Sequence, residues 1–80
     1  MVNKYKQAFQ KIETAKKLLL TVLLKNPDLA GVHKNLGLIL LQEKDIKGAS
    51  KHLREYIRLM PLATDFKAIQ SFLKNEMSND

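Results

Sequence analysis

The middle of the chain, residues 30–61, constrains the fold more than any other part of the sequence. Leu36 and Gly37 belong to an apolar stripe with the three- and four-residue spacing of a helix face, and Ala49 and Leu53 belong to a second stripe. Gly37 allows a second helix to come close, Ala49 is the small residue opposite it, and Leu53 fills the groove between them. The stretch therefore predicts two helices packed antiparallel.

The ends of these two helices are marked in the sequence. The first helix is predicted over Leu29–Gln42, and Glu43–Asp45 forms the turn. Asp45 is the expected N-cap, because its carboxylate can accept the free N–H groups of the next helix. The second helix is predicted over Ile46–Met60. Pro61 stops it, because proline has no N–H and its ring clashes with the preceding turn.

The full spacing of the stretch resembles the tetratricopeptide repeat (TPR), a 34-residue helix-turn-helix unit. With Ala30 as position 1, the residues at the pattern positions 4, 7, 8, 11, 20, 24, 27 and 32 are His33, Leu36, Gly37, Leu40, Ala49, Leu53, Tyr56 and Pro61. The chain departs from the pattern where His33 and Leu40 replace aromatic residues and where Tyr56 replaces a small one. The resemblance implies an all-α fold of antiparallel helix-turn-helix type, part of an α-solenoid, with three to four helices.

The sequence also repeats itself at an offset of 34 residues. The repeated positions are Ile12/Ile46, Ala15/Ala49, Leu19/Leu53, Leu23/Ile57 and Pro27/Pro61. Residues 11–26 therefore resemble the second helix of a preceding repeat, whose first helix would begin before Met1. No Gly, Pro or capping residue interrupts residues 7–11, so we expect one long helix over about Asn3–Lys25.

A last helix is predicted after Pro61. Thr64 or Asp65 can cap it, and Phe66, Ile69 and Leu73 form its apolar stripe. Such a helix would cover the last exposed core of a repeat array. We therefore expect a single domain over 1–77, made of a partial repeat at 1–27, a full repeat at 30–61 and a capping helix at 64–76, with a frayed polar tail at 78–80.

This organisation falls short of the roughly three repeats that such arrays usually need for stability. Leu19 and Leu23 are expected to face the central repeat, whereas Leu20 and Leu24 lie on another face, which in a longer array would meet the preceding helix. We expect this face to be covered by a second copy of the chain, by a missing domain or by the N-terminus folded back. An exposed apolar patch of this kind usually marks an interface, so Leu20 and Leu24 are candidate self-association residues.

The resemblance also implies a binding groove, because TPR-like arrays bind extended peptides or helices along a concave face. The residues that map to this face are Lys34, Asn35, Leu38, Leu41, Gln42, Ile69 and Phe72. Of the five-residue clamp with which one TPR subclass grips chaperone C-termini, only Asn35 is matched, so we do not expect that activity. The groove has a basic edge and an apolar floor, which would suit an acidic, amphipathic protein or peptide partner.

The net charge of +6 is concentrated in the first third of the chain, where six lysines accompany one glutamate. A basic segment can attract nucleic acid. The alternative function is therefore a basic helical nucleic-acid-binding domain. Against it, the lysines spread around the predicted helix, and the chain carries no aromatic stacking platform and no known binding motif. A third hypothesis, a repeat that scaffolds its own dimer, cannot be separated from the first by sequence.

No catalytic constellation is present in the sequence. The histidines are His33, expected as a partly buried structural residue, and His52, expected as a neutral surface residue. The chain has no Cys, no metal-ligand spacing and no Gly-rich phosphate loop, so we expect no enzyme activity, metal or cofactor. The apolar run Leu18–Leu24 is too short to span a bilayer and lacks a signal-peptide cleavage site, so a cytoplasmic location is expected.

Overall fold

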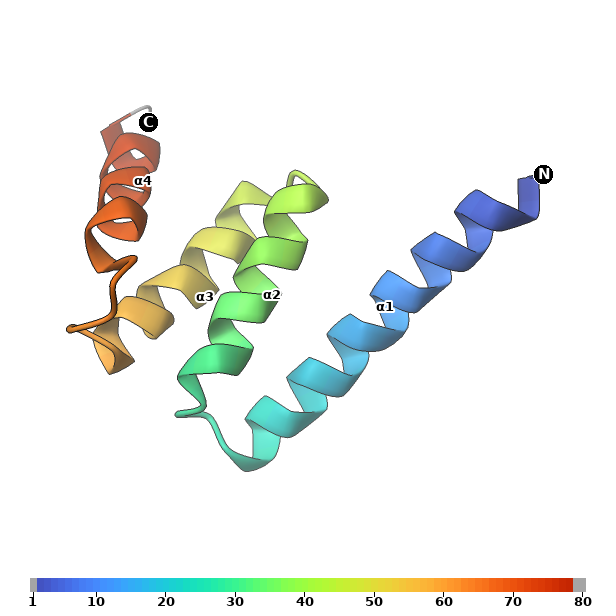
Figure 1. Cartoon of the computed structure of the whole chain (residues 1–80), viewed down its shortest axis with the longest axis horizontal. Helices are drawn as coiled ribbons and strands as arrows, with labels where there is room; N and C mark the ends of the chain where they lie inside the picture. The colour runs from blue at the N-terminus through green and yellow to red at the C-terminus, as the bar shows by residue number, and fades with distance from the viewer. Residues whose placement is uncertain (1, 79–80) are drawn as a thin grey trace.

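The computed structural model describes the backbone of residues 2–78 and the side chains of residues 6–76. Within this part the chain is all-helical, with the elements α1 (Val2–Lys25), α2 (Ala30–Gln42), α3 (Ile46–Leu59) and α4 (Phe66–Ser78) (Figure 1). The all-α fold class and the single long first helix are confirmed. Ser78, expected in the polar tail, belongs to α4, and Asn79–Asp80 lie outside the described residues.

The centre of the fold is the antiparallel pair α2 and α3. Gly37 of α2 lies against Leu53 of α3, and a Cβ added to Gly37 would stand 2.8 Å from both Cγ and Cδ2 of Leu53. Leu36 is 1% exposed, Leu53 2% and Ala49 0%. Burying one leucine side chain contributes about 1.5–3 kcal/mol, so these positions form the core that the spacing of the sequence predicted.

The turn between α2 and α3 follows a Schellman arrangement, in which the last carbonyl groups of a helix accept from the residues after it. The Asp45 N–H donates to the Leu40 carbonyl, and the Lys44 N–H donates to the Leu41 carbonyl. Lys44 has a φ of 64°, in the left-handed region where Gly or Asn is usual. Asp45 is the N-cap of α3, as predicted, since its Oδ1 accepts from the Gly48 N–H at 3.0 Å.

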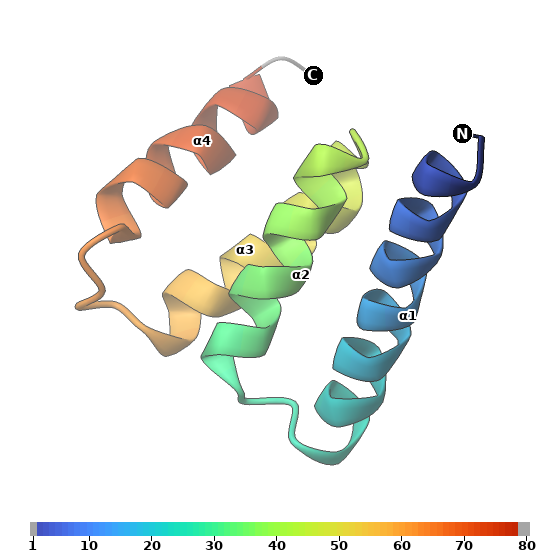
Figure 2. The same ribbon diagram turned by 45° about the vertical axis from the view of Figure 1, so that its right-hand side comes forward.

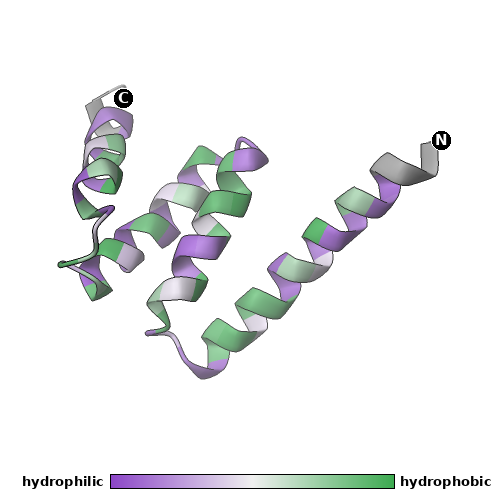
Figure 3. Ribbon diagram, viewed as in Figure 1, coloured by the Kyte–Doolittle hydropathy of each residue, from purple (hydrophilic) through white to green (hydrophobic). Residues whose placement is uncertain are grey.

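The outer helices attach to this pair on opposite sides. The second half of α1 packs antiparallel on α2, where Leu23 is buried and Lys16 Nζ lies 2.8 Å from Glu43 Oε1. The first half of α1 diverges from α2 in the view of Figure 1, whereas in the view of Figure 2 the two helices run nearly antiparallel. Helix α4 packs on α3 through the buried Leu73. The green segment at the C-terminal end of α1 in Figure 3 corresponds to the apolar run Leu18–Leu24.

Candidate functional site

The basic edge of the predicted groove is held in an ion pair. Lys34 of α2 places Nζ 2.7 Å from Asp65 Oδ2, and the same Nζ lies 5.4 Å from the centroid of the Tyr56 ring. The Tyr56 hydroxyl donates to Asp65 Oδ1 at 2.8 Å. Hydrogen bonds from Lys34 and then Tyr56 lower the pKa of Asp65, and the bond to Asp65 raises the pKa of Lys34. This network joins α2, α3 and the start of α4, and it neutralises the charge that Lys34 would present.

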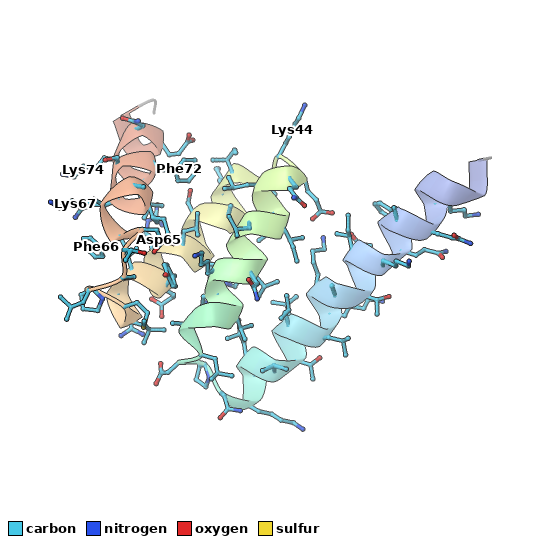
Figure 4. The ribbon with its side chains drawn as sticks, viewed as in Figure 1. Lys44, Asp65, Phe66, Lys67, Phe72 and Lys74 are labelled. Carbon is cyan, nitrogen blue, oxygen red and sulfur yellow. The ribbon has the colours of Figure 1, made fainter. Side chains whose placement is uncertain are left out.

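The remaining groove residues differ in accessibility. Leu38 is 46% exposed, and Asn35 and Gln42 are exposed beside it on α2. Leu41, Ile69 and Phe72 are half-buried. Figure 4 shows Phe72 on the side of α4 that faces α2 and α3. The accessible apolar area at the predicted groove is therefore contributed chiefly by Leu38.

The more exposed apolar surface lies on α1. Leu20 is 47% exposed and Leu24 86%, and no described part of the chain folds back over them, because α1 runs without a break from Val2. Of the three covers expected for this face, the folded-back N-terminus is therefore excluded, and a second copy or a missing domain stays a prediction. Phe9 is 61% exposed and Leu18 63%. These four side chains, Phe9, Leu18, Leu20 and Leu24, are called the exposed apolar residues of α1 below, and Leu18 lies on the opposite side of the helix from Phe9 and Leu20.

Leu20 and Leu24 were also expected on the face that would meet the preceding helix of a longer array, and the structure does not support this direction. Their counterparts 34 residues later are Arg54 and Arg58, which are exposed on α3 and do not lie under α2. Arg58 instead binds Glu55, with Nη2 2.9 Å from Oε1. Leu20 and Leu24 therefore occupy an outward flank, and a helix that packed on α1 as α2 packs on α3 would not cover them.

An open groove lies on the other flank of α1. It has a volume of about 400 Å³, and its lining residues are Gln7, Gln10, Lys11, Thr14, Ala15 and Leu18. This groove was not predicted from the sequence. The sequence did contain a signal for it in the match between Ala15 and Ala49. A small residue at this repeat position indicates close contact with a neighbouring helix, as at Ala49, whereas Ala15 lines the open groove. We call these six residues the α1 groove.

Two histidines meet between α2 and α3. His33 is buried, as expected, with Nε2 2.8 Å from the Pro27 carbonyl oxygen and Nδ1 3.1 Å from His52 Nδ1. His52 was expected on the surface but is half-buried against His33, because its position on α3 faces α2. Burial, followed by the charges of His33 and Lys51, lowers the pKa of His52.

The lysines of α1 are placed around the helix. Among the described lysines of α1, Lys16 pairs with acidic side chains, with Nζ 2.8 Å from Glu43 Oε1 and 3.0 Å from Glu13 Oε1, and these hydrogen bonds raise its pKa. Lys6, Lys11, Lys17 and Lys25 are exposed. Among the described residues, no acidic side chain forms a salt bridge with Lys11 or Lys25.

The described residues contain neither a membrane-spanning helix nor a metal-binding cluster. None of the described helices combines the length and the apolar character needed to cross a lipid bilayer. No three acidic or histidine side chains in this part of the chain gather closely enough to hold a metal ion.

Comparison of the chain with models of known protein families, with curated proteins and with solved structures gave no match.

Proposed function

We propose that the chain is a protein-interaction module of the TPR type, which binds a peptide or helix of another protein. The observation that carries the proposal is that the four exposed apolar residues of α1 stand 47–86% exposed on the two flanks of one helix. Large exposed apolar side chains on a small domain usually mark an interaction site, because removing apolar surface from water is favourable.

The remainder of the structure supports a binding role for α1 in particular. The core of the module lies between α2 and α3, and the first half of α1 extends beyond it (Figure 1). A helix of this length exposes more apolar surface than α2 can cover, and the run of leucines in residues 18–24 continues on both sides of the buried stripe. The resemblance to TPR repeats supports a protein-binding role, but it maps the groove to α2 and α4 and not to α1.

The proposal is tested by selecting peptides from a random displayed library against the immobilised chain. We expect enriched peptides that bind the wild type and lose binding to a variant carrying Leu18→Lys, Leu20→Lys and Leu24→Lys. All three leucines are at least 47% exposed, so circular dichroism should show the variant folded. Peptides that bind both forms equally, or no enrichment at all, would overturn the proposal.

Two further measurements separate the competing roles. Light scattering over a concentration series reports self-association, and a dimer that Leu20→Lys/Leu24→Lys splits would make a second copy the partner. Binding to random-sequence DNA that weakens steeply with salt would support the alternative, a basic nucleic-acid-binding domain. Flat DNA titrations at low salt would remove that alternative.

A further inference from the structure

Helices α1 and α3 match at several positions of the 34-residue repeat, but they are covered differently. Ala49 and His52 of α3 both face α2, since Ala49 is fully buried and His52 contacts His33. The residues 34 positions earlier are Ala15 and Leu18 of α1. Ala15 is half-buried, Leu18 is 63% exposed, and both line the α1 groove. At Ala15 and Leu18, the α1 groove thus overlaps the place where a helix seated as α2 is on α3 would lie.

The pair α2 and α3 also shows what such a helix must carry at its point of closest approach. Gly37 sits so near Leu53 that a single added carbon would stand 2.8 Å from two of its side-chain atoms. Leu19 is the α1 counterpart of Leu53. A helix that packs equally closely on α1 therefore needs a glycine opposite Leu19, with apolar residues one turn to either side.

The charges around the α1 groove restrict the occupant further. Lys11 and Lys25 lie seven residues to either side of Leu18, on the same side of α1, and both are exposed. Each is without an acidic salt-bridge partner in the described part of the chain. An occupant with carboxylates at the two ends of its apolar face would complement them.

A second copy of the chain does not meet these requirements. Helix α1 carries six lysines and one glutamate, so pairing two α1 helices would bring like charges together. Stacking copies head to tail would place α4 on the α1 groove. The outer side of α4 carries Lys67 and Lys74, as Figure 4 shows, with the exposed Ser71 between them. That surface is polar and basic, as is usual for the terminal element of a repeat array.

From these observations we propose that the α1 groove binds an acidic amphipathic helix of another protein, with a glycine at the centre of its apolar face. The occupant lies antiparallel to α1, as α2 lies on α3. Its apolar residues cover Ala15 and Leu18, and its carboxylates reach Lys11 and Lys25. This inference rests on the proposed function and assigns it a site and a partner chemistry.

The test uses a fluorescent synthetic helix of about 20 residues, long enough for appreciable helicity. Its apolar face copies His33, Leu36, Gly37 and Leu40 of α2, and glutamates flank that face. We expect saturable binding to the full chain by fluorescence anisotropy. Replacing the peptide's central glycine by valine should weaken binding by about tenfold or more, because it overpacks the crossing point. Replacing its glutamates by lysines should abolish binding at low salt.

Variants of the chain locate the binding site. Leu18→Lys should remove binding, whereas Leu24→Lys on the other flank should leave it unchanged. The two leucines are 63% and 86% exposed, so neither substitution disturbs the core, and circular dichroism checks this. Equal binding of the glutamate and lysine peptides, or equal loss in both variants, would overturn the proposal.

The remaining outcomes separate this inference from the proposed function. If the acidic helix does not bind but library peptides do, the inference fails and the interaction module stands. If neither binds, both fail. Self-association of the wild type that Leu18→Lys abolishes would assign the groove to a second copy and overturn the acidic partner.

Discussion

His33 and His52 share one hydrogen bond through their Nδ1 atoms, which lie 3.1 Å apart. The Pro27 carbonyl can only accept, so His33 donates from Nε2 and, when neutral, presents a lone pair at Nδ1. His52 then donates from Nδ1. This arrangement gives each Nδ1 atom a hydrogen-bond partner when both rings are neutral. It cannot accommodate two imidazolium ions, because two N–H groups would then point at each other.

The first prediction is that the chain loses stability in mild acid. The pKa of His52 lies below its ordinary value of 6.5 in the folded chain, so the unfolded chain binds the proton first. The stabilisation that comes from keeping His52 neutral is therefore complete above the ordinary pKa of 6.5, and it is lost as the pH drops toward the lower pKa of the folded chain. Denaturant unfolding between about pH 7 and pH 5 should show a decreasing free energy of unfolding.

The variant His52→Asn isolates this effect. The asparagine amide can donate to His33 Nδ1 but does not titrate, so the dependence of stability on pH should become shallower than in the wild type. NMR titration of the wild-type His52 ring should give a pKa below its ordinary value. If the free energy of unfolding of the variant depended on pH as steeply as that of the wild type, the loss of stability in acid would not come from His52.

The second prediction concerns the contact between Gly37 and Leu53. Gly37→Ala should lower the free energy of unfolding by up to about 2 kcal/mol, because overpacking costs about 1–3 kcal/mol and the better helix propensity of alanine returns about 1 kcal/mol. Gly37→Val should cost more.

Gly31 provides the matched control in the same helix. A Cβ at Gly31 meets nothing within 4 Å. Gly31→Ala should therefore stabilise the chain, by about 0.4–1 kcal/mol. Denaturant unfolding of both variants measures the two changes in the free energy of unfolding. Equal changes would show that the crossing of α2 and α3 tolerates a methyl group.

The third prediction is that Ser50→Ala stabilises the chain. Ser50 is 4% exposed, and its Oγ has no hydrogen-bond partner among the described residues. Removing an unsatisfied buried hydroxyl and gaining helix propensity should add about 0.5–1.5 kcal/mol to the free energy of unfolding.

Ser71→Ala on the exposed side of α4 measures the propensity gain alone. The difference between the two thermal or denaturant shifts then gives the cost of burying the Ser50 hydroxyl. A loss of stability in Ser50→Ala would mean that the hydroxyl has a partner in solution, such as a bound water.

The sequence by itself determined the helices and the central packing. The apolar stripes of Leu36 and Leu53, the close-approach glycine Gly37 and the N-cap Asp45 are all local patterns that operate through neighbours three or four residues away. They predicted four helical segments, and the structure confirms them. The groove residues on α2 and α4 were placed by resemblance, and their role in binding stays a prediction.

The tertiary structure decided the features that depend on distant residues. The pairing of Lys34 with Asp65, which removes a predicted basic edge, joins residues 31 positions apart. Lys44 adopts a left-handed conformation because the Schellman bonds of α2 outweigh its modest backbone cost. Which flank of α1 stays open depends on the crossing of α1 and α2. Periodicity marks a buried stripe, but three-dimensional packing determines how much of it a neighbouring helix covers.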